Sequence, residues 1–585
     1  MKKQIFLVFV IYLVIWYGIS FCSKALFSGY HIEDDHEIIS IHNEFVNKSS
    51  FLQILIREIK DDLQIRLRPL YYFERIVTIK IFGDNLLIFS FYKIFLVIIS
   101  SVFLFFSARS FNFGTLESFL VPILSFLGVQ SNIWFWRGPA ESSATLLFCL
   151  ALYSLCKYLK HENILWNLLF VFSCISMSLI KENYGLTIPA LCAFMICLEK
   201  HSKKLSWLKA LKNNFIVYFI LIFYLFLELT LIKFVIGDNQ IGYAGFELNI
   251  FRFFSVFIQF FVYNFQGVVL VILLIFSLYF KILNKQYLFI YSMIFLFFFI
   301  PQVVIYAKSG LLSSEGRYLL PAAIGFSMAI CSLLNLSCKT QVIIPQKINL
   351  ILISFLFVIG IVILMLCLLI LLNKEFCSFV LLIISSVKGN PIAEHWHDKL
   401  LDISKMFSFI GFSIIILVGF LWFDKQLKNL FLYIVFIMLI YCLLTAFIAG
   451  RNFYIEGENL RHLFDEAKNK INRNCLIVIV ADPGFNVEEV VSVTKYLNIK
   501  LNFKNIKYFF IDSNLKNTDY IKEWKNITLK LYGDKAIKNI LELNSAKCLF
   551  ILKEMDKIFI NYFAHNLSKQ FDIKKFGSRV CCIRK

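Results

Sequence analysis

Four carboxylates stand close together shortly after the first long apolar run of this chain. They are Glu33, Asp34, Asp35 and Glu37, and His36 lies among them. Adjacent carboxylates raise one another's pKa or bind a divalent cation, and an aspartate held near its working pKa can accept a proton from an attacking hydroxyl. The cluster therefore predicts a general base, or a site for Mg²⁺ or Mn²⁺ with Asp34 and Asp35 as ligands, although the sequence requires no cofactor. The alternative is helix capping, in which Asp34 or Asp35 opens the helix that follows.

Two arginines follow in the same polar region, in the stretch Arg66-Leu67-Arg68-Pro69, with Tyr71 and Tyr72 just beyond. The residue before a proline favours an extended backbone. Two guanidinium groups on such a segment can clamp a phosphate or pyrophosphate, and the aromatic faces can pack against a sugar ring. Arginines whose stems lie in the membrane interface are the alternative explanation for this motif.

Further cation and carboxylate pairs stand at the ends of later apolar runs. Arg137 is followed by Glu141, Lys181 precedes Glu182, and a third stretch reads Glu315-Gly316-Arg317-Tyr318. Gathered at one edge of a bilayer, these residues would form a polar cavity for an anionic lipid head group. Aromatic anchoring and salt bridges within loops explain each pair separately, so the prediction of a cavity depends on their coincidence. Its residues are His36, Arg137, Glu182 and Tyr318 beside the phosphate-binding candidates Arg66, Arg68, Lys181 and Arg317.

The elements that must position these residues are membrane helices. The chain has 585 residues, of which 59% are hydrophobic, with 67 Phe. This composition is typical of a polytopic membrane protein. The first run follows two lysines and has no small-residue cleavage site, so we expect a retained helix. About 13 spans of membrane length are expected, near residues 5–21, 86–107, 114–133, 143–156, 164–180, 185–198, 214–236, 254–280, 287–306, 318–336, 348–372, 406–423 and 429–449.

The distribution of lysine predicts the orientation. The formal charge is +20, and basic residues beside apolar spans indicate the cytoplasmic face more often than nucleic acid, which we exclude as a partner. Alternate loops are enriched in lysine, which places the N-terminus in the cytoplasm. The acidic cluster and the segment after residue 450 then lie outside. The basic loops contain Lys157, Lys160, Lys200, Lys203, Lys204, Lys209, Lys212, Lys281, Lys285, Lys339, Lys347, Lys425 and Lys428.

The expected fold class is therefore mainly α, a transmembrane helical bundle with a small extracytoplasmic α/β domain. The bundle covers residues 1–450 and includes a first external loop, 22–85, with two amphipathic helical stretches. Residues 451–585 form the α/β domain. Its predicted strands are 476–481, 508–511 and 549–552, and 487–497 is a predicted helix.

Two weaker signals lie elsewhere. His395 and His397 with Asp398 have the composition of a metal site, but alternate positions on a helix point apart. Asp482-Pro483-Gly484 follows a predicted strand and precedes a predicted helix, where open α/β sheets bind ligands, and a plain turn explains it equally well.

Taken together, these positions resemble the polytopic GT-C glycosyltransferases, which use sugars carried on polyprenyl phosphate. The similarity includes an acidic pair after the first span, a long first external loop ending in Arg-x-Arg-Pro, a Lys-Glu at a middle span and Arg-Tyr-Leu-Leu-Pro at a late one. The arrangement looks like the aminoarabinose transferases of lipid A, the protein O-mannosyltransferases and the bacterial oligosaccharyltransferases. The C-terminal domain has no Trp-Trp-Asp-Tyr-Gly stretch, which argues against the last group.

The resemblance implies a catalytic aspartate, Asp34 or Asp35 beside Glu33, which activates the acceptor or positions a metal. It also implies that Arg66, Arg68, Lys181 and Arg317 bind the donor phosphate. The expected protein is a glycosyltransferase of the bacterial inner membrane that moves a sugar from polyprenyl phosphate to an extracytoplasmic glycan, glycolipid or protein. The alternatives are a transporter or flippase, or a polymerase or ligase, of lipid-linked polysaccharide.

Overall fold

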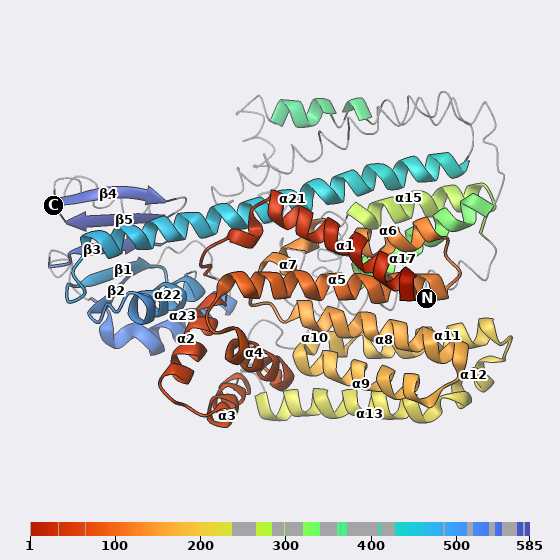
Figure 1. Ribbon diagram of the computed structural model, residues 1–585, viewed down its shortest axis with the longest axis horizontal. Coiled ribbons are helices and arrows are strands. Elements are labelled where there is room, and N and C mark those ends of the chain that lie inside the picture. Colours follow the sequence, from red (N-terminus) through yellow and green to blue (C-terminus); the bar gives the residue numbers. More distant parts are fainter. Residues whose placement is uncertain are drawn as a thin grey trace.

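A computed structural model of the chain describes residues 2–32, 34–64, 66–236, 265–283, 320–339, 427–483, 486–511, 519–537, 545–552, 570–576 and 579–584, with a few residues between 298 and 411. The described part is mainly helical and carries a small sheet at one end (Figure 1). This arrangement is the fold class that the sequence predicts. His395, His397 and Asp398 lie outside the described residues.

The helical bundle is built from long apolar helices. Six described helices are long and apolar enough to cross a membrane, or seven if the bent pair Thr115–Phe126 and Val129–Phe135, which meet at 71°, forms one span. The prediction of about 13 spans is therefore not confirmed. The principal helices are α1 (Lys2–Cys22), α5 (Leu86–Ser110), α6 (Thr115–Phe126), α7 (Asn132–Phe135), α8 (Glu141–His161), α9 (Ile164–Ile180), α11 (Ile188–Ser202), α12 (Trp207–Asn213), α13 (Phe215–Leu231), α15 (Phe265–Tyr279), α17 (Leu320–Lys339) and α21 (Leu427–Lys470).

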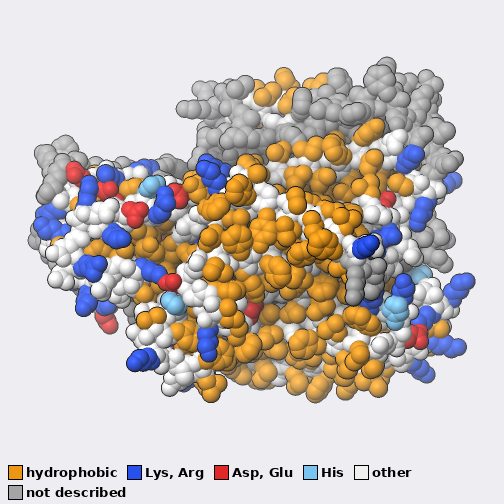
Figure 2. Space-filling model, in the orientation of Figure 1, with side chains coloured by type: hydrophobic (Ala, Val, Ile, Leu, Met, Phe, Trp, Pro, Cys, Tyr) orange, Lys and Arg blue, Asp and Glu red, His pale blue; other side chains and the backbone are white. Residues whose placement is uncertain are grey.

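The surface of the bundle is apolar where a bilayer would contact it. Apolar side chains cover the middle of the face seen in Figure 2, while lysine and arginine gather near the N-terminal end and over the C-terminal domain. Large side chains such as Phe172 and Phe219, 62% and 58% exposed, face outward. Such a surface is stable in lipid and not in water. The chain is therefore a multi-pass membrane protein.

Residues 22–85, the predicted first external loop, contain three short helices beside the end of the bundle. These are α2 (Asp35–Val46), α3 (Phe51–Asp62) and α4 (Pro69–Phe82), and the first two fall where the apolar spacing predicts helices. Helix α3 begins with a capping box, in which Ser50 accepts from the Gln53 amide and the Gln53 side chain accepts from the Ser50 amide. Pro69 opens α4, where its fixed φ suits the first helical turn.

The C-terminal domain contains a five-stranded sheet in the order β2-β1-β3-β5-β4. Strands β1 (Ile477–Ala481), β2 (Ile506–Phe510) and β3 (Cys548–Ile551) are parallel, and β5 (Arg579–Arg584) pairs antiparallel with both β3 and β4 (Phe571–Phe576). Helices α22 (Val487–Lys495) and α23 (Asp519–Tyr532) complete the described part of the domain. The sequence predicts β1 to β3 and α22 but misses β4, β5 and α23.

One helix joins the bundle to the C-terminal domain without a break. Helix α21 has 44 residues and runs from the bundle along the sheet (Figure 1), and the predicted domain boundary at residue 450 falls inside it. Tyr30, Ile32 and Ile39 of the first external loop are part of the same buried apolar cluster as α21 and the sheet. The C-terminal domain is thus packed directly on the loop that carries the acidic cluster.

Candidate functional site

The acidic cluster forms a tight turn that leads into α2. We refer to residues 28–37 as the acidic turn. Asp34 has a φ of 61° and precedes the helix, which begins at Asp35. Asp and Asn adopt this left-handed conformation more readily than other non-glycine residues. The turn directs the two neighbouring carboxylates to different surroundings, and this separates their roles.

Asp35 is fully buried and paired with Arg137. Its Oδ2 lies 2.6 Å from Nη1 of Arg137 and accepts from the amide of His31 at 2.9 Å. Burial raises the pKa of Asp35, and the positive charge of Arg137 opposes this rise. With no exposed surface and a fixed cation beside it, Asp35 is suited to hold the turn in place and not to meet a substrate.

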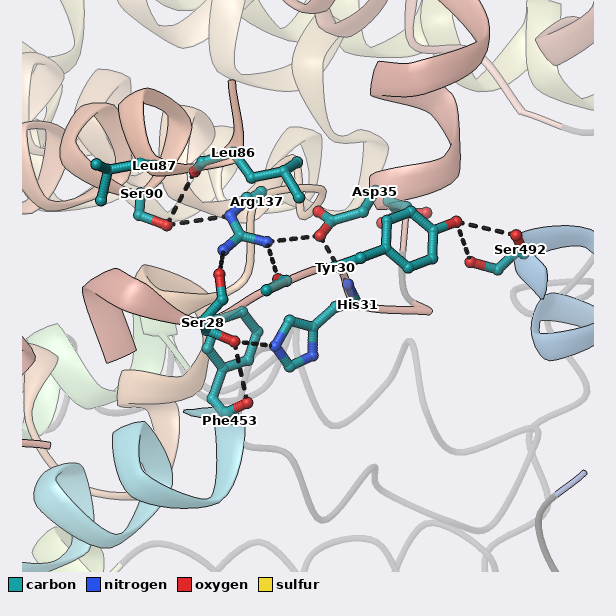
Figure 3. A network of polar contacts seen from close by, with 12 residues as sticks. Ser28, Tyr30, His31, Asp35, Leu86, Leu87, Ser90, Arg137, Phe453 and Ser492 are labelled. Carbon is teal, nitrogen blue, oxygen red and sulfur yellow. Dashed lines mark hydrogen bonds and ion pairs between the residues drawn. The ribbon is translucent and has the colours of Figure 1, made fainter. Parts of the chain in front are cut away.

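Arg137 is the centre of the polar network in Figure 3. Besides Asp35, it donates to the carbonyls of Ser28 and Gly29 at 2.7 and 2.9 Å, and its Nε donates to Ser90 Oγ at 3.0 Å. A guanidinium group offers five donors in a fixed plane, so it can bind several acceptors at once. The sequence assigned Arg137 to a lipid head-group cavity, whereas in the structure its donors are directed at the backbone of the acidic turn.

Asp34 has a more open environment than Asp35. It is half-buried, and its side chain makes no capping hydrogen bond to α2, so the capping alternative does not account for it. Its carbonyl accepts from Nη2 of Arg75 at 2.6 Å. A Cβ added at Gly138 would overlap the Asp34 side chain, so this carboxylate lies directly against the loop before α8.

Arg75 links Asp34 to a second carboxylate, that of Glu37. Its Nη1 donates to the Arg137 carbonyl at 2.8 Å, and its Nε lies 3.4 Å from Glu37 Oε2. The Tyr71 hydroxyl lies 3.2 Å from the same oxygen. Burial raises the pKa of Glu37, and Arg75 opposes this rise. Arg75 thus joins the backbone of Asp34 to that of Arg137, while Glu37 balances its charge.

A small polar cavity lies beside this arrangement, between α4, α5 and the 137–143 segment. Its free volume is about 10 Å³, and three cations and one carboxylate line it. A cavity of this size has room for one water molecule at most. Lys93 donates here to the Pro139 carbonyl at 3.0 Å, and Glu74 accepts from Tyr92 and Ser143 at 2.7 Å. Its charged lining residues are Glu74, Arg75, Lys93 and Arg137.

The predicted phosphate ligands Arg68 and Lys181 lie next to the same region, each beside a carboxylate. Arg68 donates to Asp62 at 2.6 and 3.3 Å, and its guanidinium lies 4.9 Å from the centre of the Tyr71 ring. Lys181 Nζ lies 3.1 Å from Glu141. The charge of Arg68 interacts with those of Glu37 and Glu182. Arg68 therefore lies near both the acidic turn and the Lys181–Glu182 pair.

Glu182 differs from these paired acids, because it is 9% exposed and neither carboxylate oxygen has a hydrogen-bond partner within the described chain. Arg66 lies in the α3–α4 connection, where its amide donates to the Asp62 carbonyl at 2.6 Å. Glu33, Arg317 and Tyr318 lie outside the described residues.

No metal-binding group was found in the part of the chain that the structure describes. There, no three His, Cys, Asp or Glu side chains are grouped so as to hold an ion. Asp35 already has Arg137 as its counter-charge, and burial, reinforced by the charge of Lys495, lowers the pKa of His36 to about 4. A divalent cation at Asp34 and Asp35 stays a prediction from sequence.

Sequence reasoning missed Arg75, Glu74 and Lys93. Its spacing could have indicated Arg75. It follows Arg68 by seven residues, which is two helical turns and places both on one face of a helix. Lys93 lies inside an apolar run, where a lone charge is itself a sign of function.

The fold and site together define a polytopic helical membrane protein in which a small α/β domain packs on the loop of residues 22–85. No family model matches the sequence, and no curated protein sequence matches it significantly. Among solved structures, ArnT from Cupriavidus metallidurans bound to undecaprenyl phosphate is similar, with a TM-score of 0.52, 9% identity, and coverage of 98% of this chain and 97% of that one. ArnT from the same organism in the apo state has a TM-score of 0.51 and 12% identity, with coverage of 99% of this chain and 98% of that one. The likeness extends over the whole chain and confirms the predicted GT-C, ArnT-like fold.

Proposed function

We propose that this chain is a membrane glycosyltransferase that moves a sugar from a polyprenyl-phosphate donor to a hydroxyl outside the cytoplasm. The observation that carries the proposal is that Asp34 has a half-buried carboxylate and that Arg75 binds its backbone carbonyl, in a fold shared end to end with a protein that binds undecaprenyl phosphate. A carboxylate so placed can accept a proton while nearby cations stabilise a departing phosphate.

Asp34 is the proposed base, and Asp35 is the proposed anchor. The acceptor hydroxyl attacks the anomeric carbon and gives its proton to Asp34. The bond between the anomeric carbon and the phosphate oxygen breaks, and the polyprenyl phosphate leaves with that electron pair. Asp35 cannot act as the base in place of Asp34, because its carboxylate is fully buried against Arg137.

Arg68 and Lys181 are the proposed donor-phosphate ligands, with Arg66 and Arg317 as further candidates from sequence. Arg68 donates from Nε and Nη2 to Asp62, so its Nη1 makes no hydrogen bond within the described residues and can donate to a phosphate oxygen. Glu182 lies beside Arg68 and would then face the sugar that is attached to that phosphate. None of the proposed steps uses a metal ion.

The orientation is part of the same proposal. In Figure 1 the N-terminus lies at one end of the bundle, and the acidic turn and the C-terminal domain lie at the other. The lysine-rich loop that includes Lys203 lies at the N-terminal end, which supports a cytoplasmic N-terminus in the bacterial inner membrane. A reporter fused at residue 460 should give an extracytoplasmic signal, and a cytoplasmic signal would refute this orientation.

The direct test is turnover by the purified protein in lipid nanodiscs. Undecaprenyl phosphates carrying different labelled sugars are supplied with an envelope extract as acceptor, and released undecaprenyl phosphate is measured. We expect release with at least one donor, dependent on the extract. Binding of sugar-loaded lipid without any release, together with its movement across a bilayer, would favour the flippase alternative.

A further inference from the structure

We propose that the C-terminal domain acts on the reaction by fixing the acidic turn, and that Tyr30 is the positioning residue through which it does so. The inference rests on the proposed function, since it concerns the placement of Asp34. In this proposal the C-terminal domain acts by positioning Asp34, and it need not touch the acceptor.

Tyr30 connects the acidic turn to the C-terminal domain through both its hydroxyl and its ring. The hydroxyl lies 2.6 Å from Ser492 Oγ and donates to the Ser492 carbonyl at 3.0 Å (Figure 3). The ring centre lies 4.6 Å from that of Tyr496 and 6.0 Å from that of Phe464. Tyr30 is 4% exposed, so this contact is buried and strongly directional.

The other side of the turn is fixed to the membrane module. The His31 ring stacks on Phe453 of α21 with a centroid distance of 3.6 Å, and Ser28 bonds both the His31 ring and the Phe453 carbonyl. Although Phe453 lies beyond residue 450, its side chain belongs to the buried apolar cluster of the bundle and not to that of the C-terminal domain. At Gly457 an added Cβ would lie 2.9 Å from the amide of Gly29, so only glycine allows this approach. The turn is therefore held from two sides, and Tyr30 supplies the side that belongs to the C-terminal domain.

Asp34 lies four residues after Tyr30, in a conformation that few residues adopt. Its φ of 61° persists only when its surroundings fix it. Arg137 and Arg75 fix the backbone from the membrane side. Helix α22, which carries Ser492, packs against α2, which begins at Asp35. A small shift of α22 relative to the bundle would therefore move the carboxylate of Asp34.

Displacements of this size have large effects on catalysis. A shift of about 1 Å in a reacting group can lower a rate by roughly 100-fold. Loss of a single positioning hydrogen bond, with the ring still packed, should cause a smaller displacement. We expect Tyr30→Phe to lower kcat by about 10-fold and to leave KM for the polyprenyl-phosphate donor unchanged, because the phosphate ligands lie on α4 and beside α9.

The matched control is Tyr508→Phe. Tyr508 is also buried in the C-terminal domain, and its hydroxyl lies 3.1 Å from Thr494, two residues beyond Ser492 on the same helix. The change removes an equivalent hydrogen bond that does not reach the acidic turn. A variant that only weakens the domain should behave as Tyr508→Phe does.

The experiment compares hydrogen–deuterium exchange of peptides covering residues 28–37 in the full-length wild type, Tyr30→Phe and Tyr508→Phe. Faster exchange in these peptides only for Tyr30→Phe, with the fall in kcat, is the expected result. Equal exchange in the two variants would overturn the proposal, as would a fall in kcat of the same size in both. The exchange measurement needs no substrate, so it decides the positioning role even if the wild type transfers no sugar and the proposed function fails.

Discussion

Removing one partner of the Asp35–Arg137 pair should destabilise the protein far more than removing an exposed ion pair. Asp35→Asn keeps the shape of the side chain but leaves the Arg137 charge buried among neutral acceptors, the carbonyls of Ser28 and Gly29 and the hydroxyl of Ser90. Breaking one side of a buried pair costs about 3–5 kcal/mol. Arg137→Met should cost at least as much, because it also releases two backbone carbonyls.

The assay is unfolding of the purified protein in mixed micelles, followed by tryptophan fluorescence. Glu44→Gln is the control, since Glu44 pairs with Arg57, whose side chain is 45% exposed, and such pairs contribute about 0–1 kcal/mol. The double variant Asp35→Leu with Arg137→Met should lose less than the sum of the single losses, because it leaves no unpaired buried charge. A loss below 1 kcal/mol for Asp35→Asn would refute the assignment of Asp35 as a structural anchor.

Three further outcomes follow from the site. Gly138→Ala should lower transfer at least 10-fold by displacing Asp34, whereas Gly18→Ala, which meets nothing within 4 Å, should leave it unchanged; equal activity in the two variants would contradict the contact. Because burial lowers the pKa of His36 to about 4, His36 stays neutral in the folded state below pH 6.5, where it takes up a proton in the unfolded chain. In unfolding curves, His36 should account for roughly 2 kcal/mol of the stability lost between pH 7 and pH 5. Burial also lowers the pKa of His31, so the wild type should lose more than this in total, and His36→Gln should remove only the His36 part. Arg68→Gln should weaken binding of undecaprenyl phosphate about 10-fold in native mass spectrometry, and unchanged binding would remove Arg68 from the phosphate site.

Much of the framework could be predicted because it depends on local patterns. Apolar runs of membrane length predict α1, α5 and α13, and apolar spacing predicts α2 and α3 in the first external loop. The edge strand β4 was missed because the alternation of apolar and charged residues breaks at Lys574 and Lys575, and its pairing with β5 depends on the fold.

The proposed division of roles between Asp34 and Asp35 could not be predicted from sequence. It depends on Arg137, which lies 102 residues away and reaches only one of the two carboxylates. Likewise, nothing local to Tyr30 indicates a partner in the C-terminal domain, 462 residues further along the chain. Long-range contacts of this kind determine which member of a motif meets the substrate.

The central claim is that Asp34 accepts the proton of the acceptor hydroxyl, and the kinetics of Asp34→Asn test it most directly. Asparagine tolerates the positive φ of this position, so the fold should be kept. We predict that kcat for sugar transfer falls by about 10²–10⁴-fold while the affinity for undecaprenyl phosphate and the unfolding curve stay those of the wild type. Transfer by Asp34→Asn at the wild-type rate would contradict the account.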